Sequence, residues 1–150
     1  MIDLKKELYR QCLIYVQNRI DEAKQALDDT QAATNDDTKS SAGDKYETGR
    51  EMMQQETNRN LGQLNEANKL KVALNTIGTG FGKETAEPGS LVITDNGSFY
   101  LAISAGILKV NNDVYYAVSP ASPMGIKLKG LKSGNKFTLN EKSYLVKQVI

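Results

Sequence analysis

The chain contains no histidine, no tryptophan and a single cysteine in 150 residues. Without histidine it cannot form a Ser-His-Asp triad, a Cys-His pair or a histidine-based zinc site. Cys12 has no partner for an internal disulfide, and it lies within an apolar helical stripe. We therefore expect Cys12 to be a buried structural thiol and not a nucleophile. These absences exclude most nucleophilic and zinc-dependent enzymes.

Long apolar runs are also absent. No run exceeds that of residues 12–16, which is too short to span a bilayer, and the charged first ten residues precede no apolar segment typical of a secretion signal. The chain is 39% apolar and 25% charged with a net charge of +1, as in an ordinary soluble protein. We therefore expect a cytoplasmic protein that contacts no membrane and is a monomer.

Proline is absent before residue 88, and two long helical patterns fill most of this part of the chain. In the first pattern, apolar residues step by three and four as in a coiled-coil seam. Its expected inward positions are Leu13, Val16, Ile20, Ala23, Leu27 and Thr30. The second pattern runs from Tyr46 to about Asn75, with expected inward positions at Met53, Leu61, Leu64, Ala67, Leu70 and Leu74. Both stripes are narrow, so the sequence predicts that the helices pack on each other as a long antiparallel coiled-coil hairpin over residues 1–76.

The segment between the two patterns, about residues 30–45, is the expected tip of this hairpin. Small residues from Ser40 to Gly43 predict a turn, and Asp44 is placed to cap the helix that follows. Residues 28–51 hold seven acids and three bases, so the tip is strongly acidic. Polar connections are usually solvated loops, so this charge alone does not distinguish a connector from a functional site.

The composition changes at residue 77, where a segment with four glycines and the first proline marks a linker into a second domain. Short runs with a period of two follow, as expected for strands, at residues 90–94, 98–104, 107–110, 113–118, 136–139 and 144–150. Asp95-Asn96-Gly97 predicts a type I′ hairpin turn. Ser122-Pro123 predicts the start of a short helix that ends at Gly130. We expect residues 77–150 to form a small α+β domain with a twisted antiparallel sheet, so the chain as a whole belongs to the α+β class.

Parts of both domains resemble a known family. Residues 119–139, SPASPMGIKLKGLKSGNKFTL, are similar to the C-terminal signature of the bacterial Gre transcript-cleavage factors, which has a Ser-Pro turn, a short helix ending in Leu-x-Gly and a tight turn before a strand. Residues 87–92 are similar to that family's Gly-Ser-x-Val sequence. If a short insertion is allowed near residue 43, the family's tip pattern is matched by Asn35, Asp37, Ala42 and Tyr46. The resemblance implies an FKBP-like fold for the second domain.

The resemblance also implies a function at the tip. The partner would be RNA polymerase, the hairpin would enter its secondary channel, and nascent RNA and DNA would be met only within the elongation complex. RNA hydrolysis by two metal ions needs a second Mg²⁺, which prefers carboxylate oxygens. Asp37 is the first candidate ligand of this ion, and Asp36 and Asp44 are the candidates for assisting it. Of these two, Asp44 is the candidate for a second ligand of the same ion. The chain alone would then have no nuclease activity, because half of the site belongs to the polymerase.

Two further surfaces are candidates for contacts. By the resemblance, Ser122, Pro123 and Met124 would contact the polymerase, although Met124 beside a tight turn is equally suited to the core. Basic residues are suited to RNA phosphates, but solvated helix faces usually carry such charges as well. These basic residues are Arg19, Arg50 and Arg59 in the hairpin and the cluster Lys127, Lys129 and Lys132 in the second domain.

The tip departs from the family at Ser40, where the family pattern has a glutamate. This departure favours a second interpretation, a Gre-like regulator that occupies the channel without stimulating cleavage. A third interpretation is an FKBP-like binding or prolyl isomerase module whose coiled coil serves for dimerisation. Its pocket would be lined by aromatic residues that are more often core in so small a sheet, namely Phe99, Tyr115, Tyr116 and Phe137.

Overall fold

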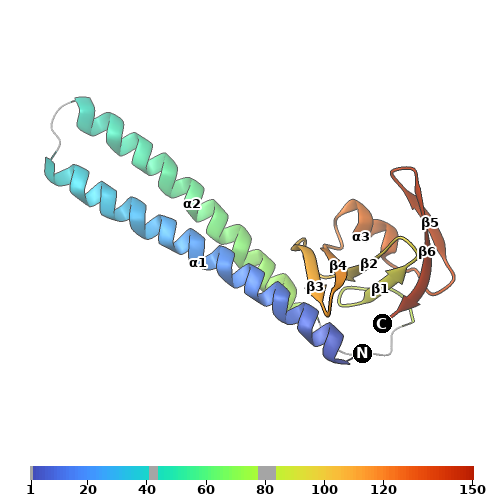
Figure 1. The fold of residues 1–150 in the computed structure, drawn as a ribbon. Helices are drawn as coiled ribbons and strands as arrows, with labels where there is room; N and C mark the ends of the chain where they lie inside the picture. Colours follow the sequence, from blue (N-terminus) through green and yellow to red (C-terminus); the bar gives the residue numbers. More distant parts are fainter. Residues whose placement is uncertain (1, 41–43, 78–83) are drawn as a thin grey trace. The chain divides into compact units, whose positions relative to one another are not determined.

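The computed structural model describes residues 2–40, 44–77 and 84–150, with the side chains of 2–3, 34–40 and 44–48 left out of the description. The N-terminal part is a hairpin of two helices, α1 (Ile2–Ser40) and α2 (Asp44–Thr76), as Figure 1 shows. The expected hairpin of two long helices is confirmed. Helix α1 contains neither glycine nor proline, so nothing interrupts its backbone hydrogen bonding over 39 residues.

Half of the expected inward positions of the hairpin are buried, at Val16, Ile20, Ala23, Thr30, Ala67 and Leu74, and the others are half-buried or exposed. In α1 the seam passes through Cys12, and Leu13 and Leu27 are only half-buried. In α2, Leu61 was expected to face inward, but it is 44% exposed and its neighbour Asn60 is buried. The buried positions among the described side chains are Lys5, Leu8, Cys12, Val16, Ile20, Ala23 and Thr30 in α1 and Asn60, Ala67 and Leu74 in α2. The α2 positions recur every seven residues, so one polar residue completes a heptad seam that apolar spacing alone did not reveal.

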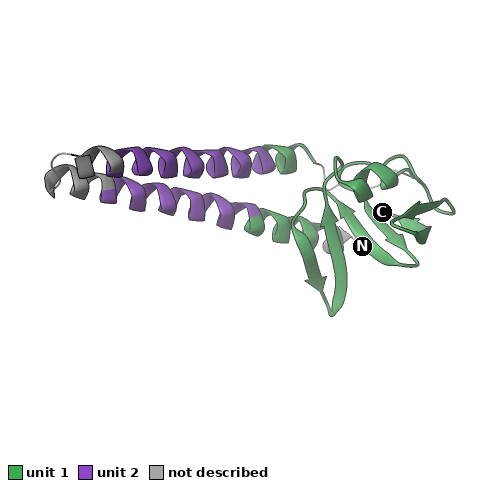
Figure 2. Cartoon of the chain, turned by 90° about the horizontal axis from the view of Figure 1, so that it is seen from above, with its two compact units in different colours: residues 1–15, 72–150 green, residues 16–71 purple. Residues whose placement is uncertain are grey.

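The chain forms two compact units, drawn in different colours in Figure 2. Unit 1 consists of residues 1–15 and 72–150, and unit 2 consists of residues 16–71. The expected domain boundary at residue 76 assigned both helices to one domain, whereas here the first turns of α1 and the end of α2 belong to the same unit as the sheet. Gln11 accounts for part of this grouping, because its side-chain amide donates to the carbonyl of Lys109 at 2.9 Å.

Unit 1 contains a six-stranded sheet with strand order β3-β4-β2-β1-β6-β5. The strands are β1 (Leu91–Thr94), β2 (Gly97–Leu101), β3 (Gly106–Val110), β4 (Asp113–Val118), β5 (Lys136–Leu139) and β6 (Lys142–Val149). They lie within a few residues of the predicted runs. The expectation of a wholly antiparallel sheet is wrong, because β2 and β4 pair in parallel. The chain leaves β2, forms β3 at the sheet edge and returns along β4 in the direction of β2, so the sheet is mixed.

The hairpin turns differ from the predicted ones. Both central residues have positive φ at Asn111 and Asn112 (52° and 70°) and again at Asn140 and Glu141 (51° and 67°), as type I′ turns require. At the β1–β2 turn only Gly97 has positive φ, so the type I′ turn predicted there is wrong. The hydroxyl of buried Thr94 instead closes that turn, accepting from the Asn96 N–H and donating to the Gly97 carbonyl.

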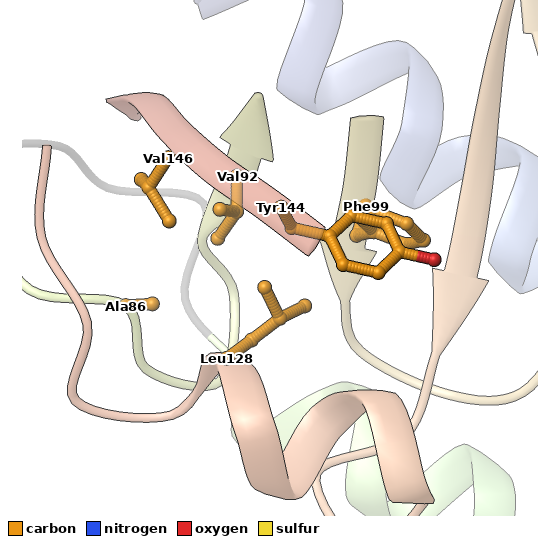
Figure 3. Packing of buried hydrophobic residues seen from close by; sticks show 6 residues of the cluster. All are labelled: Ala86, Val92, Phe99, Leu128, Tyr144 and Val146. Carbon is orange, nitrogen blue, oxygen red and sulfur yellow. The ribbon is translucent and has the colours of Figure 1, made fainter. Parts of the chain in front are cut away.

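The apolar core of the sheet lies under helix α3 (Pro123–Leu128), as Figure 3 shows. Leu128 points from α3 toward side chains of β1, β2 and β6. The buried members of this core are Ala86, Val92, Phe99, Leu128, Tyr144 and Val146. Successive residues of a strand face opposite sides, so Tyr100, next to Phe99, lies on the other face of β2. Its side chain is fully buried there, and both faces of the sheet are therefore packed within unit 1.

Candidate functional site

The acidic tip is the candidate site that the sequence singles out. Asp36 and Asp37 belong to the last turns of α1, and Asp44 begins α2, so the two helix ends bring these residues to the same connection. Their side chains lie outside the described residues, and so does that of Ser40. The predicted convergence of the three carboxylates therefore stays a prediction. Among the described side chains, no group of three or more acidic, histidine or cysteine residues is placed to hold a metal ion.

A buried polar contact joins the two helices below the tip. The side-chain amide of Asn60 donates to the hydroxyl of Thr30 at 3.2 Å, and that hydroxyl donates to the Ala26 carbonyl at 2.9 Å. Asn60 and Thr30 are 3% and 7% exposed. A buried polar residue in a coiled coil loses its partner if the helices slide, so this contact favours one register of the hairpin. Thr30 was predicted for the seam, but Asn60 was not.

The arginines proposed for RNA contacts differ in their surroundings. Arg59 forms an ion pair with Glu56 on the preceding turn of α2, and its side chain remains 66% exposed. Such an exposed pair contributes little to stability. Arg50 is exposed, and Arg19 is exposed on α1. None of the described contacts gives these three residues a role beyond that of a solvated helix face.

The segment from Ser119 to Leu128 is built by its own hydrogen bonds. Ser122 caps α3, because its hydroxyl accepts from the Gly125 N–H at 3.0 Å and donates to the Ser119 carbonyl at 2.6 Å. Pro123 occupies the first helical position, as predicted. At Gly125, a Cβ atom would lie only 1.9 Å from the Ser119 carbonyl oxygen. The segment is therefore rigid, and Ser122 and Gly125 serve its geometry directly.

The residues predicted to contact polymerase are not equally accessible. Ser122 is engaged in the cap, and Met124 is half-buried and packs against the core of the sheet. Pro123 is exposed, and so is Ile126, whose side chain is 64% exposed one turn further along α3. Sequence reasoning placed Ile126 in the helix without identifying it as a surface residue. On this segment, the exposed apolar residues are Ala121, Pro123 and Ile126, and Ile126 is the largest of them.

The aromatic residues proposed to line a binding pocket pack mainly against each other. The rings of Phe137 and Tyr144 stack with centroids 4.8 Å apart, and Phe99 meets Tyr144 edge to face at 6.0 Å. Tyr116 lies 5.7 Å from Phe99, whereas Tyr115, its neighbour on β4, faces the opposite side of the sheet. The four candidate residues therefore do not line one pocket. Their packing in unit 1 is that of core and core-margin residues.

A cleft of about 660 Å³ lies in unit 1 between the start of α1 and the β3–β4 hairpin. Its lining carries two carboxylates, an ammonium group and a phenol beside apolar side chains, from Leu4, Glu7, Lys109, Val110, Asn111, Asp113 and Tyr115. Hydrogen bonds from Arg10 and Gln11 lower the pKa of Glu7 to about 2, so this carboxylate stays ionised. Burial and the nearby charge of Asp113 raise the pKa of Tyr115. Neither motif nor spacing pointed to this cleft in the sequence.

Besides Tyr115, three buried groups among the described residues of unit 1 have a shifted pKa. Burial raises the pKa of the Cys12 thiol to about 12, which confirms the expected inert, structural cysteine. Burial, and after it the charges of Cys12 and Tyr9, raise the pKa of Tyr100, so the base of α1 lies close to this face of β2. Burial lowers the pKa of Lys5 and the charge of Glu87 opposes that shift. The Tyr100 hydroxyl has no hydrogen-bond partner among the described residues.

Comparisons with known proteins add no assignment. The sequence matches no family model, and neither the curated proteins nor the solved structures give a significant match. In the described part of the chain, neither long helix has the length of continuous apolar surface needed to cross a membrane. The proposals below therefore rest on the sequence and on the geometry of the chain itself.

Proposed function

We propose that this chain is a Gre-like transcription elongation factor that acts on RNA polymerase in the cytoplasm. In this proposal, the helical hairpin enters the secondary channel of the polymerase and its acidic tip assists cleavage of backtracked RNA. The second domain, proposed to be FKBP-like, docks on the outside of the enzyme. DNA and RNA are contacted only within the elongation complex.

The observation that carries the proposal is the hairpin itself. Two helices of 39 and 33 residues without proline precede and follow the connection at the tip, and residues 28–51 around it hold seven acids and three bases. At about 1.5 Å per residue, the shorter helix is about 50 Å long. A hairpin of this length with a narrow cross-section suits delivery of its tip into a deep channel. A dimerisation module has no evident need for an excess of acids around that connection.

The tip chemistry rests on the residue types present. Carboxylates of Asp36, Asp37 and Asp44 are hard oxygen donors of the kind that Mg²⁺ prefers. When bound there beside the polymerase's own ion, Mg²⁺ would supply Lewis acidity for RNA hydrolysis. The role of the chain is to carry one or two carboxylates to the RNA 3′ end and to hold them there. The register contact between Thr30 and Asn60 supports that positioning by fixing how the two helix ends meet.

The docking surface is refined by the exposure of the Ser119–Leu128 segment. Ser122 and Met124 hold the segment in shape, so the proposed contact with polymerase falls mainly to Pro123 and Ile126. Met124→Asp would place a charge against the core and would disturb folding as well as docking. Ile126→Asp is the better probe, because its side chain is already largely in solvent. We expect it to weaken polymerase binding without lowering stability by more than about 0.5 kcal/mol.

The decisive experiment adds the protein to a stalled, backtracked complex of its own polymerase with Mg²⁺ and follows RNA length. The proposal expects shortened RNA with the wild-type chain and loss of cleavage with Asp37→Asn, while polymerase binding is nearly unchanged. Asp21→Asn is the matched control, since it removes one exposed carboxylate of α1 outside the acidic residues 28–51. Equal cleavage by the wild type and Asp37→Asn would remove Asp37 from the site. Absence of polymerase binding by the intact chain would overturn the whole proposal.

One observation favours a second function, a Gre-like regulator that occupies the channel without stimulating cleavage. The family's glutamate is replaced at the tip by Ser40, which has no charge to share in metal binding. Ser40→Glu separates the two functions. If the wild-type chain binds polymerase without shortening the RNA and Ser40→Glu creates cleavage, the regulator is the correct assignment. If the wild type already cleaves, Ser40→Glu should only increase the rate.

A further inference from the structure

The lysines of the C-terminal segment have no ionic partners among the described residues. The described residues contain three ion pairs, and all three lie within the long helices, at Glu7–Arg10, Glu56–Arg59 and Glu66–Lys69. Residues 119–150 contain six lysines and one acid, Glu141. All six are exposed, at Lys127, Lys129, Lys132, Lys136, Lys142 and Lys147. This part of unit 1 therefore carries a surplus of positive charge that the protein does not neutralise internally.

Three of these lysines lie close together. Lys136 on β5 is paired with Leu145 on β6, and Lys147 lies two residues further along β6, at the register shift between β6 and β1, so the Cα atoms of the two lysines are diagonal neighbours about 7 to 8 Å apart. The turn that carries Lys132 is fixed to β6 because the Ser133 hydroxyl donates to the Lys147 carbonyl at 2.8 Å. We call Lys132, Lys136 and Lys147 the lysine surface.

The lysine surface is turned away from the core and lacks aromatic rings. Along β5 and β6 the alternating residues Phe137, Tyr144 and Val146 pack on the core side. The rings of Phe137 and Tyr144 stack on each other there, so they offer no platform to an unpaired base. Asp95, in the turn between β1 and β2, also contacts β6, where its carboxylate accepts the Leu145 N–H at 2.8 Å.

Protection of a sheet edge accounts for only one of these lysines. A lysine on an edge strand discourages pairing with another chain, and β5 is an edge strand, so this explanation fits Lys136. Lys147 lies on β6, which is paired on both sides, and Lys132 forms an isolated antiparallel bridge with Thr85. Neither residue lies on an edge strand of the sheet. The proximity of the three lysines calls for a different explanation.

We propose that the lysine surface binds the phosphate backbone of duplex nucleic acid without reading its sequence. Exposed ammonium groups neutralise phosphates and release counterions, which supplies most of non-specific binding. Single-stranded binders add aromatic stacking, and the lysine surface has none, so the geometry favours a duplex. The proposal goes beyond the proposed function and does not depend on it, because it needs no polymerase.

The test measures binding of the full chain to a short labelled DNA duplex of random sequence, and to a single-stranded RNA of the same length, by fluorescence anisotropy. The triple variant Lys132→Gln, Lys136→Gln and Lys147→Gln removes the surface. The matched control changes three exposed lysines of the helices, Lys6, Lys24 and Lys71, to Gln. We expect the first variant to weaken duplex binding ~10-fold or more at 50 mM salt, with a salt dependence shallower by about 2.7 in the log–log slope.

Each alternative outcome has a defined meaning. Equal loss in the control variant would show that overall charge, not the lysine surface, binds the duplex. Tighter binding of single-stranded RNA than of duplex would refute the choice of ligand. Unchanged duplex binding together with lost polymerase binding in the triple variant would assign the surface to an acidic protein instead. Replacement of the same three lysines by arginine keeps the charge and should preserve binding, and the circular dichroism melting curve of each variant checks folding.

Discussion

Unit 1 and unit 2 differ in how much apolar side chain they bury. Among the largest fully buried side chains in the described residues, only Val16 belongs to unit 2, and the others belong to unit 1. The buried seam of unit 2 consists of Val16 and Ile20, two alanines, and the polar pair Thr30 and Asn60. Unit 1 packs both faces of a sheet. Burial of apolar surface is the main favourable contribution to folding, so unit 2 should be the less stable region.

The two units also differ in their charges. Two of the three described ion pairs lie in unit 2 and one on the first turns of α1 in unit 1, all between residues three apart on a helix. The lysines of the sheet and α3 have no such partners in the described residues. In the described residues, unit 2 therefore combines a thin seam with two ion pairs, whereas the sheet and α3 combine a dense core with lysines that have no ion pair.

The largest expected effect on stability is that of replacing a glycine in unit 1, because Gly125 of unit 1 and Gly62 of unit 2 differ in the space around an added Cβ atom. At Gly125 in unit 1, an added Cβ would meet the Ser119 carbonyl oxygen at 1.9 Å, and this backbone atom cannot move without breaking the Ser122 cap. Gly125→Ala should therefore destabilise unit 1 by about 3 to 5 kcal/mol. Gly62 in unit 2 is exposed in a helix with no atom within 4 Å of its Cβ position. Gly62→Ala should stabilise the hairpin by about 0.5 to 1 kcal/mol.

Urea unfolding followed by two signals tests this pair. Six of the seven tyrosines belong to unit 1, so tyrosine fluorescence reports on that unit, whereas far-ultraviolet circular dichroism is dominated by the helices. Gly125→Ala should shift the fluorescence transition to lower urea, and Gly62→Ala should shift the dichroism transition to higher urea. Similar small shifts for both variants would mean that the Ser119–Leu128 segment yields easily, contrary to its hydrogen bonding.

Much of the fold could be predicted because local patterns and tertiary packing agree. The two helices, the six strand positions and the Ser122-Pro123 helix start all follow from periodicity and capping. The parallel pairing of β2 and β4 could not be predicted, since strand spacing does not specify which strands become neighbours. The β1–β2 turn was assigned wrongly because Asn-Gly is a strong signal, yet the Thr94 hydroxyl stabilises another turn geometry.

The candidate site was less accessible to sequence reasoning. The acids of the tip follow from composition, but composition does not specify which of their side chains converge. Asn60 was missed because the helical periodicity was traced through apolar residues alone. Asn60 is polar and is buried with a hydrogen-bond partner, so it does not belong to that pattern. The exposure of Ile126 was missed because a helix of six residues leaves several positions for its buried face.

The second prediction tests whether the thin seam of unit 2 is what holds the hairpin together. Ile20 is 3% exposed, and Ile20→Ala leaves a cavity that the narrow seam can only partly close, at a cost of about 2 to 3 kcal/mol. Glu22 is exposed on the same helix, so Glu22→Ala should change stability by less than about 0.5 kcal/mol. The dichroism midpoint in urea should separate the two variants, and the fluorescence midpoint should change little. Equal dichroism midpoints would show that the seam is wrongly assigned.

The smallest effect is expected at Tyr100, where unit 1 has a defect that unit 2 avoids. In the hairpin the buried amide of Asn60 has its partner, whereas the fully buried Tyr100 hydroxyl has none among the described residues. An unsatisfied buried hydroxyl costs free energy, so Tyr100→Phe should stabilise unit 1 by about 1 kcal/mol. The matched control is Tyr116→Phe, on a side chain that is 39% exposed, with an expected change below about 0.5 kcal/mol. A loss of stability in Tyr100→Phe would contradict this prediction. It would show that the hydroxyl makes a hydrogen bond to an ordered water, which the substitution removes. Since phenylalanine removes a fluorophore at the site, thermal unfolding by calorimetry is the measurement that treats both variants equally.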